Sequence, residues 1–152
     1  MDIEKPLIRE GEEVRALVRY TREQITQFAQ LTGDQNPLYH DRQAAERAGF
    51  GAVVASGQQT ASQMMGAVAT HFTRVDDGPA REMLCLESSF AFPNPVFAEH
   101  DVQIHWRVTS VERHHSRAGF VGHLEGTASV GGRPCVTARA AVLVRASAVR
   151  LA

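Results

Sequence analysis

The sequence lacks the features by which membrane, exported and nucleic-acid-binding proteins are commonly recognised. No apolar run approaches the roughly 18 residues that a membrane-spanning helix needs. The chain begins MDIEKPLIREGEEV, which is acidic where a signal peptide would be basic and then apolar. The net charge is only -1, with acidic and basic residues interspersed, so no basic surface for nucleic acid or an anionic membrane is indicated. We therefore expect a cytoplasmic protein with neither kind of partner.

Potential metal ligands are also scarce. The chain has two cysteines, Cys85 and Cys135, which lie far apart and match no metal-binding spacing. Both lie in apolar, strand-like runs, so we expect two reduced and partly buried thiols. His100 and His105 are not spaced like a pair of helical ligands either. The sequence therefore predicts no metal site and no redox cofactor.

What remains is the composition of an ordinary globular protein. At 152 residues, with 43% apolar and 22% charged residues, the chain is long enough for one core and one domain over residues 1–152. The first part, EEVRALVRY, alternates apolar and charged residues, which is typical of a half-buried strand. Thr21 and Gln24 then fit a capping box that begins a helix, and Gly33 is placed to end it.

Two further helices are predicted before the middle of the chain. Asp41 is a good N-cap for the short segment RQAAERA, which Gly49 ends. Ser56 and Gln59 form a second capping-box pattern, with Gly57 at the first helical position. The helix that follows is rich in alanine, glycine, serine and threonine. Such small side chains suit a helix that other elements wrap closely.

The second half of the chain predicts strands. Long alternating and β-branched runs follow one another, and VGGRP, Val130 to Pro134, is a tight hairpin signal between the last two. Hairpin-linked strands give a mainly antiparallel sheet, with one face on the central helix. The predicted class is α+β.

One polar segment stands out between the first two helices: LTGDQNPLYHD, Leu31 to Asp41. Asn36-Pro37 forces an extended or turn conformation there. With its flanks, FAQLTGDQNPLYHDRQAAERAGFGAVVASGQQTAS, it resembles the hydratase motif and helix start of the MaoC-like hot-dog family. The later FAFPNPVFAEHDVQIHWRVTSV is similar to that family's "PV" strand and tight turn. The resemblance extends over about Val14 to Val144.

This family includes (R)-specific enoyl-CoA hydratases and 3-hydroxyacyl-thioester dehydratases. The resemblance implies a hot-dog fold, in which an antiparallel sheet wraps a central helix, with an additional N-terminal helical overhang. It also implies a lyase that adds water to, or removes it from, the α,β bond of an acyl thioester. Asp34 matches the catalytic aspartate, Asn36 the motif asparagine, and Gly57 the glycine whose N–H polarises the thioester carbonyl. Ser62 and the neighbouring Gln58 are candidate substrate-binding residues, or ordinary polar helix residues.

Elementary chemistry supports these roles. Hydration of an enoyl thioester builds negative charge on the carbonyl oxygen, and a helix N-terminus offers unpaired N–H groups to that charge. A carboxylate such as Asp34 can accept the proton of water if partial burial raises its pKa. Asp34 and Asn36 could instead simply cap and pin the loop. The only carrier group that the reaction requires, CoA or the phosphopantetheine of a carrier protein, belongs to the substrate.

The sequence departs from the motif at one position. Where the hydratases have the catalytic histidine, this chain has Tyr39, and His40 comes one residue late. A phenol, with a reference pKa of about 10, is a poor base near neutrality but a usable hydrogen-bond donor. Tyr39 could therefore line the acyl site or pack on the central helix. His40 is a second candidate for the catalytic group, or a solvent-facing loop residue.

Three functions follow from these observations. The first is a hydratase or dehydratase. The second is a non-catalytic, acyl-thioester-binding subunit that completes a heterodimer with an active hot-dog partner, which Tyr39 favours. The third is a thioesterase, in which Asp34 would activate water against the carbonyl. In each case the resemblance implies a dimer with its sheets joined edge to edge. Arg107, Arg113 and Arg117 are candidates for binding CoA phosphates, or ordinary surface arginines.

Overall fold

The computed structural model describes residues 6–75 and 78–147. The predicted domain of 1–152 therefore includes terminal residues, and two residues of the loop after the central helix, that lie outside the described part. The elements in chain order are β1 (Glu13–Arg19), α1 (Arg22–Thr32), the 3-10 helix η1 (Pro37–Tyr39), α2 (Arg42–Arg47), β2 (Val54–Ala55), α3 (Gly57–Thr73), β3 (Arg81–Ala91), β4 (Val96–Phe97), β5 (Asp101–Arg113), β6 (Phe120–Val130) and β7 (Arg133–Ala146).

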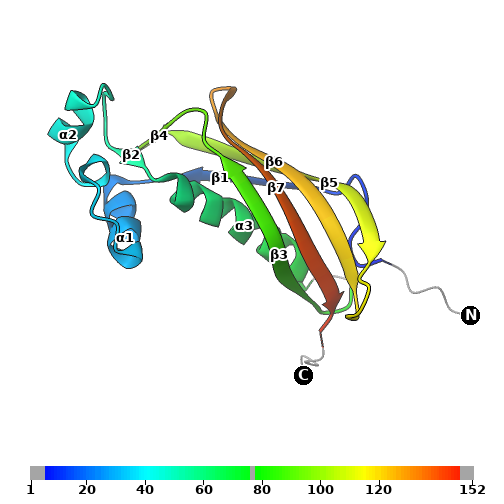
Figure 1. Cartoon of the computed structure of the whole chain (residues 1–152). Coiled ribbons are helices and arrows are strands. Elements are labelled where there is room, and N and C mark those ends of the chain that lie inside the picture. The colour runs from blue at the N-terminus through cyan, green and yellow to red at the C-terminus, as the bar shows by residue number, and fades with distance from the viewer. Residues whose placement is uncertain (1–5, 76–77, 148–152) are drawn as a thin grey trace, which may run out of the picture.

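The predicted α+β hot-dog architecture is confirmed. Five described strands form one antiparallel sheet in the order β1-β5-β6-β7-β3, and β2 pairs with β4 in a small second sheet. Helix α3 lies along one face of the large sheet, which curves around it (Figure 1). The overhang of α1, η1 and α2 projects beyond the end of the sheet at which α3 begins. The predicted β6–β7 hairpin is present, with Gly131 and Gly132 both at positive φ.

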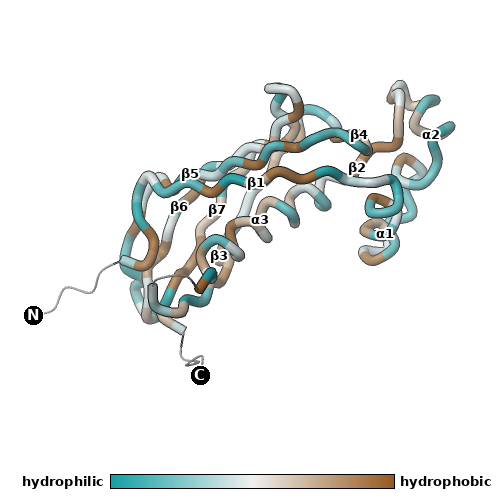
Figure 2. Tube along the Cα trace, turned by 180° about the vertical axis from the view of Figure 1, so that it is seen from behind, coloured by the Kyte–Doolittle hydropathy of each residue, from teal (hydrophilic) through white to brown (hydrophobic). Residues whose placement is uncertain are grey.

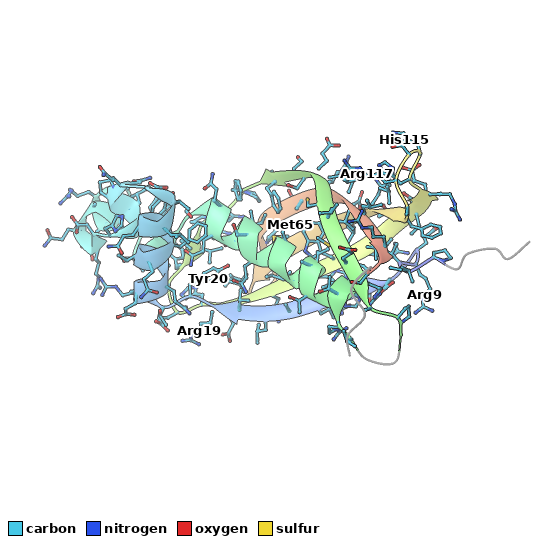
Figure 3. The ribbon with its side chains drawn as sticks, turned by 90° about the horizontal axis from the view of Figure 1, so that it is seen from below. Arg9, Arg19, Tyr20, Met65, His115 and Arg117 are labelled. Atoms are coloured by element: carbon cyan, nitrogen blue, oxygen red, sulfur yellow. The ribbon has the colours of Figure 1, made fainter. Side chains whose placement is uncertain are left out.

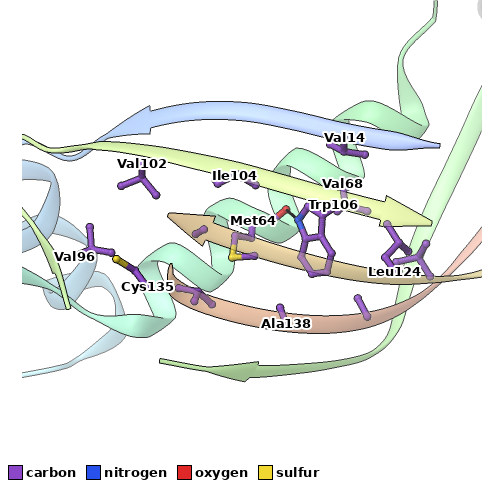
Figure 4. Close-up of a cluster of buried hydrophobic side chains, with 14 of the residues drawn as sticks. Val14, Met64, Val68, Val96, Val102, Ile104, Trp106, Leu124, Cys135 and Ala138 are labelled. Carbon is purple, nitrogen blue, oxygen red and sulfur yellow. Dashed lines mark hydrogen bonds between the residues drawn. The ribbon is translucent and has the colours of Figure 1, made fainter. Parts of the chain in front are cut away.

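The core lies between α3 and the inward side chains of the sheet. Met64, Val68 and Phe72 of α3 are fully buried, and Trp106 of β5 lies beside Met64 and Val68 (Figure 4). The facing position on β6 is Gly126, where a Cβ atom would overlap the Trp106 indole. Brown apolar segments along the strands alternate with teal polar ones in Figure 2, as the two-residue period requires.

Local capping explains where the helices begin. Thr21 and Gln24 form the complete capping box, and Gly33 ends α1 at φ 72. Asp41 caps α2 by accepting from the Gln43 N–H. The second predicted capping box is wrong for one of its two hydrogen bonds. Ser56 does accept from the Gln59 N–H, but the Gln59 amide donates to the Gln24 backbone oxygen instead of turning back to Ser56. The start of α3 is thereby joined to α1.

The outer face of the sheet is polar and carries one ordered row of charges. Glu13, Arg107, Glu125 and Arg139 lie opposite one another across β1, β5, β6 and β7, so the sign alternates at each strand. His105 also faces this side, as its alternation with buried neighbours predicts. The cysteine prediction is only partly right: both thiols are free, but Cys85 is exposed on the edge strand β3, whereas Cys135 is buried.

Candidate active site in the overhang and at the start of the central helix

The overhang loop is built from two successive side-chain turns. Asp34 Oδ1 accepts a hydrogen bond from the Asn36 N–H at 3.0 Å, and Asn36 Oδ1 accepts from the Leu38 N–H at 3.2 Å. Pro37 follows at the first position of η1, where its missing N–H costs nothing. Both side chains therefore pin the loop, and Asn36 does so in the way the structural interpretation predicts. Asp34 remains half-buried and keeps its second carboxylate oxygen for other partners.

Tyr39 lies in the same cluster. Burial raises the pKa of the Tyr39 phenol, the negative charge of Asp34 raises it further, and a hydrogen bond with the Asn36 side chain opposes both effects. The Tyr39 backbone oxygen accepts from the Thr26 hydroxyl of α1, which fixes the residue against that helix. The phenol is therefore a neutral hydrogen-bond donor close to the Asp34 carboxylate.

His40 is held differently. Its Nε2 lies 3.1 Å from the backbone oxygen of Asp34 and not from the carboxylate. Because a carbonyl oxygen only accepts, Nε2 carries the proton and leaves Nδ1 as the acceptor in the neutral ring. Tyr39 and His40 line a hollow of about 380 Å³, together with Val53 and the α1 residues Arg22, Glu23, Thr26 and Gln27.

Gly57 lies in a second hollow. It is the first residue of α3, and its N–H precedes the first hydrogen bond within the helix. This cavity of about 250 Å³ is lined by α3, by the loop between β3 and β4 and by β7. A Cβ atom at Gly57 would come within 2.7 Å of the Phe92 ring, so that ring lies directly on the helix start.

The structure thus brings Asp34, Asn36, Tyr39 and His40 together and places Gly57 in a second cavity. The two hollows share no lining residue; Val53 borders one, and Ala55, two residues later, borders the other. The other predicted binding residues, Gln58 and Ser62, are exposed on α3 and line neither hollow.

The arginines proposed for CoA phosphates lie elsewhere in this chain. Arg117 is at the end of the molecule opposite the overhang, beside His115 and at the same end as Arg9 (Figure 3). Arg113 stacks over the Phe120 ring, with 5.3 Å from its guanidinium carbon to the ring centroid. Arg107 borders a hollow of about 510 Å³ on the outer face of the sheet, which contains none of the motif residues.

Sequence reasoning missed several residues that shape the two hollows. Thr26 and Gln27 face the loop from α1, and Phe92 and Cys135 line the cavity at Gly57. Only Phe92 carried a usable signal, since an aromatic residue directly before Pro93-Asn94-Pro95 is held in a restricted loop. Cys135 looked like an ordinary strand residue.

With this geometry in view, comparison with known proteins identifies the family. Residues 5–127 match the model of the MaoC-like domain family. The chain belongs to this family. Among curated protein sequences, none matches this MaoC-like chain closely enough to count as a relative. Solved structures do match over nearly the whole chain, as expected for a shared hot-dog fold.

Three of these structures illustrate the similarity in fold. The (R)-hydratase from A. caviae involved in PHA biosynthesis is 25% identical, with a TM-score of 0.75 over 90% of this chain and 96% of that one. R-hydratase PhaJ1 from Pseudomonas aeruginosa is 21% identical, with a TM-score of 0.76 over 97% and 91%. The HadBC (3R-hydroxyacyl-ACP dehydratase) complex from Mycobacterium tuberculosis is 20% identical, with a TM-score of 0.71 over 89% and 96%.

Two features are absent from the described residues. Across 6–75 and 78–147, no group of three or more histidine, cysteine, aspartate or glutamate side chains could hold a metal ion. Within that same part of the MaoC-like chain, no helix is long and apolar enough to cross a membrane.

Proposed function

We propose that this MaoC-like chain is a cytoplasmic lyase that hydrates enoyl thioesters or dehydrates 3-hydroxyacyl thioesters, with the acyl chain carried by CoA or a carrier protein. The observation that carries the proposal is the Asp34–Tyr39 pair. A half-buried carboxylate and a neutral phenol lie together in the loop that occupies the position of the hydratase motif. Along the chain, α3 begins directly after the short strand β2.

In the hydration direction the Asp34 carboxylate accepts a proton from water while the water oxygen bonds to the β-carbon of the substrate. The electron pair of the α,β bond moves toward the thioester carbonyl, and the Gly57 N–H at the helix start stabilises the resulting oxyanion. The protonated Asp34 then delivers the proton to the α-carbon, so one water is added and the enzyme is restored. Tyr39 donates a hydrogen bond that orients the water. No further cofactor takes part.

A dimer is part of the proposal. Strand β3 is an edge strand with both faces largely exposed, and Leu84 and Leu86 are each 42% exposed on it. An edge of this length presents unpaired backbone groups, which pairing with a second β3 would satisfy. The second strand belongs either to another copy of this chain or to a related hot-dog subunit.

The second candidate is a non-catalytic acyl-thioester-binding subunit of such a heterodimer. Tyr39 in the position of the motif histidine favours it, because a phenol with a raised pKa supplies no second base. Two of the similar structures are complexes of paired proteins, ChsH1-ChsH2 and HadBC. In this alternative the active carboxylate comes from the partner.

One assay separates these functions. The purified protein is incubated with crotonyl-CoA and with 3-hydroxybutyryl-CoA, while enoyl-thioester absorbance and free thiol are followed. We expect turnover that Asp34→Asn lowers by a factor of about 10² to 10⁴ and that His40→Ala leaves in place. Asp41→Asn is the matched control, because asparagine caps α2 as well as aspartate does. Tight acyl-CoA binding without turnover would support the non-catalytic subunit, and thiol release would indicate a thioesterase.

A further inference from the structure

The cavity beside Gly57 has an apolar interior. Its walls include Phe50, Val96 and Val136, and the buried Cys135 sulfur lies beside Val96 (Figure 4). The two hydroxyl side chains on its wall already have partners: Ser56 accepts from the Gln59 N–H, and Thr60 accepts from the Tyr20 hydroxyl. Apart from the Gly57 N–H at the helix start, such a lining is mainly apolar and suits an alkyl chain.

Phe92 forms the outer wall of this cavity. The side chain is 46% exposed, and its inner surface covers Gly57 at the start of α3. One side of the ring therefore faces solvent and the other faces the cavity. Replacing Phe92 with a small residue would open the cavity outward without touching the Asp34–Tyr39 loop.

The loop that carries Phe92 is attached to β7 by the Asn94 side chain, which makes two hydrogen bonds. Asn94 Nδ2 donates to the Pro134 backbone oxygen at 2.7 Å, and Asn94 Oδ1 accepts from the Arg133 guanidinium at 2.6 Å. Both partners belong to the start of β7, directly after the β6–β7 hairpin. These two hydrogen bonds hold the loop of Phe92 against the start of β7.

We propose that this cavity takes the alkyl end of the acyl chain and that Phe92 sets the upper limit on its length. The inference rests on the proposed function, because it starts from a thioester carbonyl bound at the Gly57 N–H. At about 30 Å³ for each water-sized group, the 250 Å³ cavity holds roughly eight such groups. Two of these groups are the carbonyl oxygen and the sulfur of the thioester, so the preferred substrates are short acyl thioesters of up to about six carbons.

Binding of saturated acyl-CoA tests the limit without depending on turnover. Butyryl-, hexanoyl-, octanoyl- and decanoyl-CoA are titrated calorimetrically into the wild-type protein, Phe92→Ala and Leu17→Ala. Leu17 is the control because it is an exposed apolar side chain on the far edge strand β1. We expect wild type and Leu17→Ala to bind decanoyl-CoA at least about tenfold more weakly than butyryl-CoA, and Phe92→Ala to remove most of that difference.

A second measurement tests whether the acyl chain occupies this cavity. In a Cys85→Ser background, the rate of alkylation of Cys135 by a small thiol reagent should rise in Phe92→Ala and fall when butyryl-CoA is bound. An unchanged chain-length profile in Phe92→Ala, or Cys135 alkylation that butyryl-CoA leaves unaffected, overturns the inference. If crotonyl-CoA is still hydrated in that case, the proposed function stands. If no enoyl-CoA is turned over but Phe92→Ala still shifts the binding profile, the hydratase proposal fails and the chain-length limit stands.

Discussion

The indole N–H of Trp106 donates a hydrogen bond to the Met64 backbone oxygen at 3.1 Å, in the fully buried centre of the molecule. Strand β5 and helix α3 are thereby joined by a polar contact inside an apolar core. The bond explains why the largest side chain of the chain lies at this place, since a buried indole N–H needs a partner. It also fixes α3 along its axis, and with it the position of the helix start.

Trp106→Phe should lower the free energy of unfolding by about 2 to 3 kcal/mol, because both the hydrogen bond and part of the packed volume are lost. Thermal or chemical unfolding followed by circular dichroism measures the change. Gly126→Ala should also destabilise, since its Cβ would overlap the indole, and less so in a Trp106→Phe background. Gly66→Ala is the matched control. It lies on α3 with open space around it and should raise stability by about 0.5 to 1 kcal/mol.

Tyr39→Phe should lower kcat of the proposed hydration by about 10- to 100-fold and change KM little, because the lost hydroxyl orients the water and holds no part of the substrate. Steady-state kinetics on crotonyl-CoA measure the split. His40→Ala should retain the wild-type rate, since its Nε2 is hydrogen-bonded to a backbone oxygen. Equal activity in Tyr39→Phe and wild type would remove the phenol from the mechanism.

The two tyrosines of the chain provide a pH test. Burial is the main cause that raises the pKa of both Tyr20 and Tyr39 above the usual value of a phenol. The folded chain therefore holds these protons more tightly than the unfolded chain does. Their contribution to stability is fully present below about pH 10 and is lost as the pH rises from there through the raised values. Phenolate absorbance in Tyr20→Phe isolates Tyr39, and a midpoint at or below that of free tyrosine would contradict the burial.

The contact between Gly57 and Phe92 should appear as coupling between two substitutions. Gly57→Ala alone forces the Phe92 ring outward and should weaken short acyl-CoA binding, and its coupling energy with Phe92→Ala should be about 0.5 to 3 kcal/mol. The double variant Gly57→Ala with Phe92→Ala should recover part of that loss. Additive effects on the binding free energy would mean that the ring does not rest on the helix start in solution.

Glu99 offers a prediction about stability alone. It adopts φ 65, the left-handed region, in the turn between β4 and β5, and its side chain makes an exposed ion pair with Arg19. Glu99→Gly should therefore raise the unfolding free energy by about 1 kcal/mol, because the strain removed exceeds the value of a surface ion pair. Glu99→Ala, which keeps the strain and loses the pair, is the control and should not stabilise.

Much of the fold followed from local chemistry in the sequence. Thr21 with Gln24, Gly33, and Asp41 each define a helix end through bonds to nearby backbone groups, so the sequence alone predicted them. The prediction for Gln59 was wrong because its amide donates to the backbone oxygen of Gln24, which is 35 positions away. Strand alternation predicted the inward faces but gave no indication that Cys85 lies on an exposed edge, which depends on strand order.

The candidate site divides in the same way. Asp34, Asn36, Tyr39 and His40 are near neighbours in the chain, so their assembly into one loop was predictable. The cavity at Gly57 joins α3, the β3–β4 loop and β7, and no local pattern connects Phe92 to Cys135. The hydrogen bonds of Asn94 with Arg133 and Pro134 likewise join residues about forty positions apart.

The charge row on the outer face has a consequence for how the strands find their pairing. A shift of β1 by two residues keeps the same face outward, but in one direction it would set Arg15 against Arg107 in place of Glu13. A shift by one residue would turn the charged side chains into the core. Each opposite-charge pair contributes about 0.2 to 1 kcal/mol, and like charges directly opposite destabilise the pairing. The alternating row thus disfavours misaligned sheets during folding, on a face of the molecule that contains none of the motif residues.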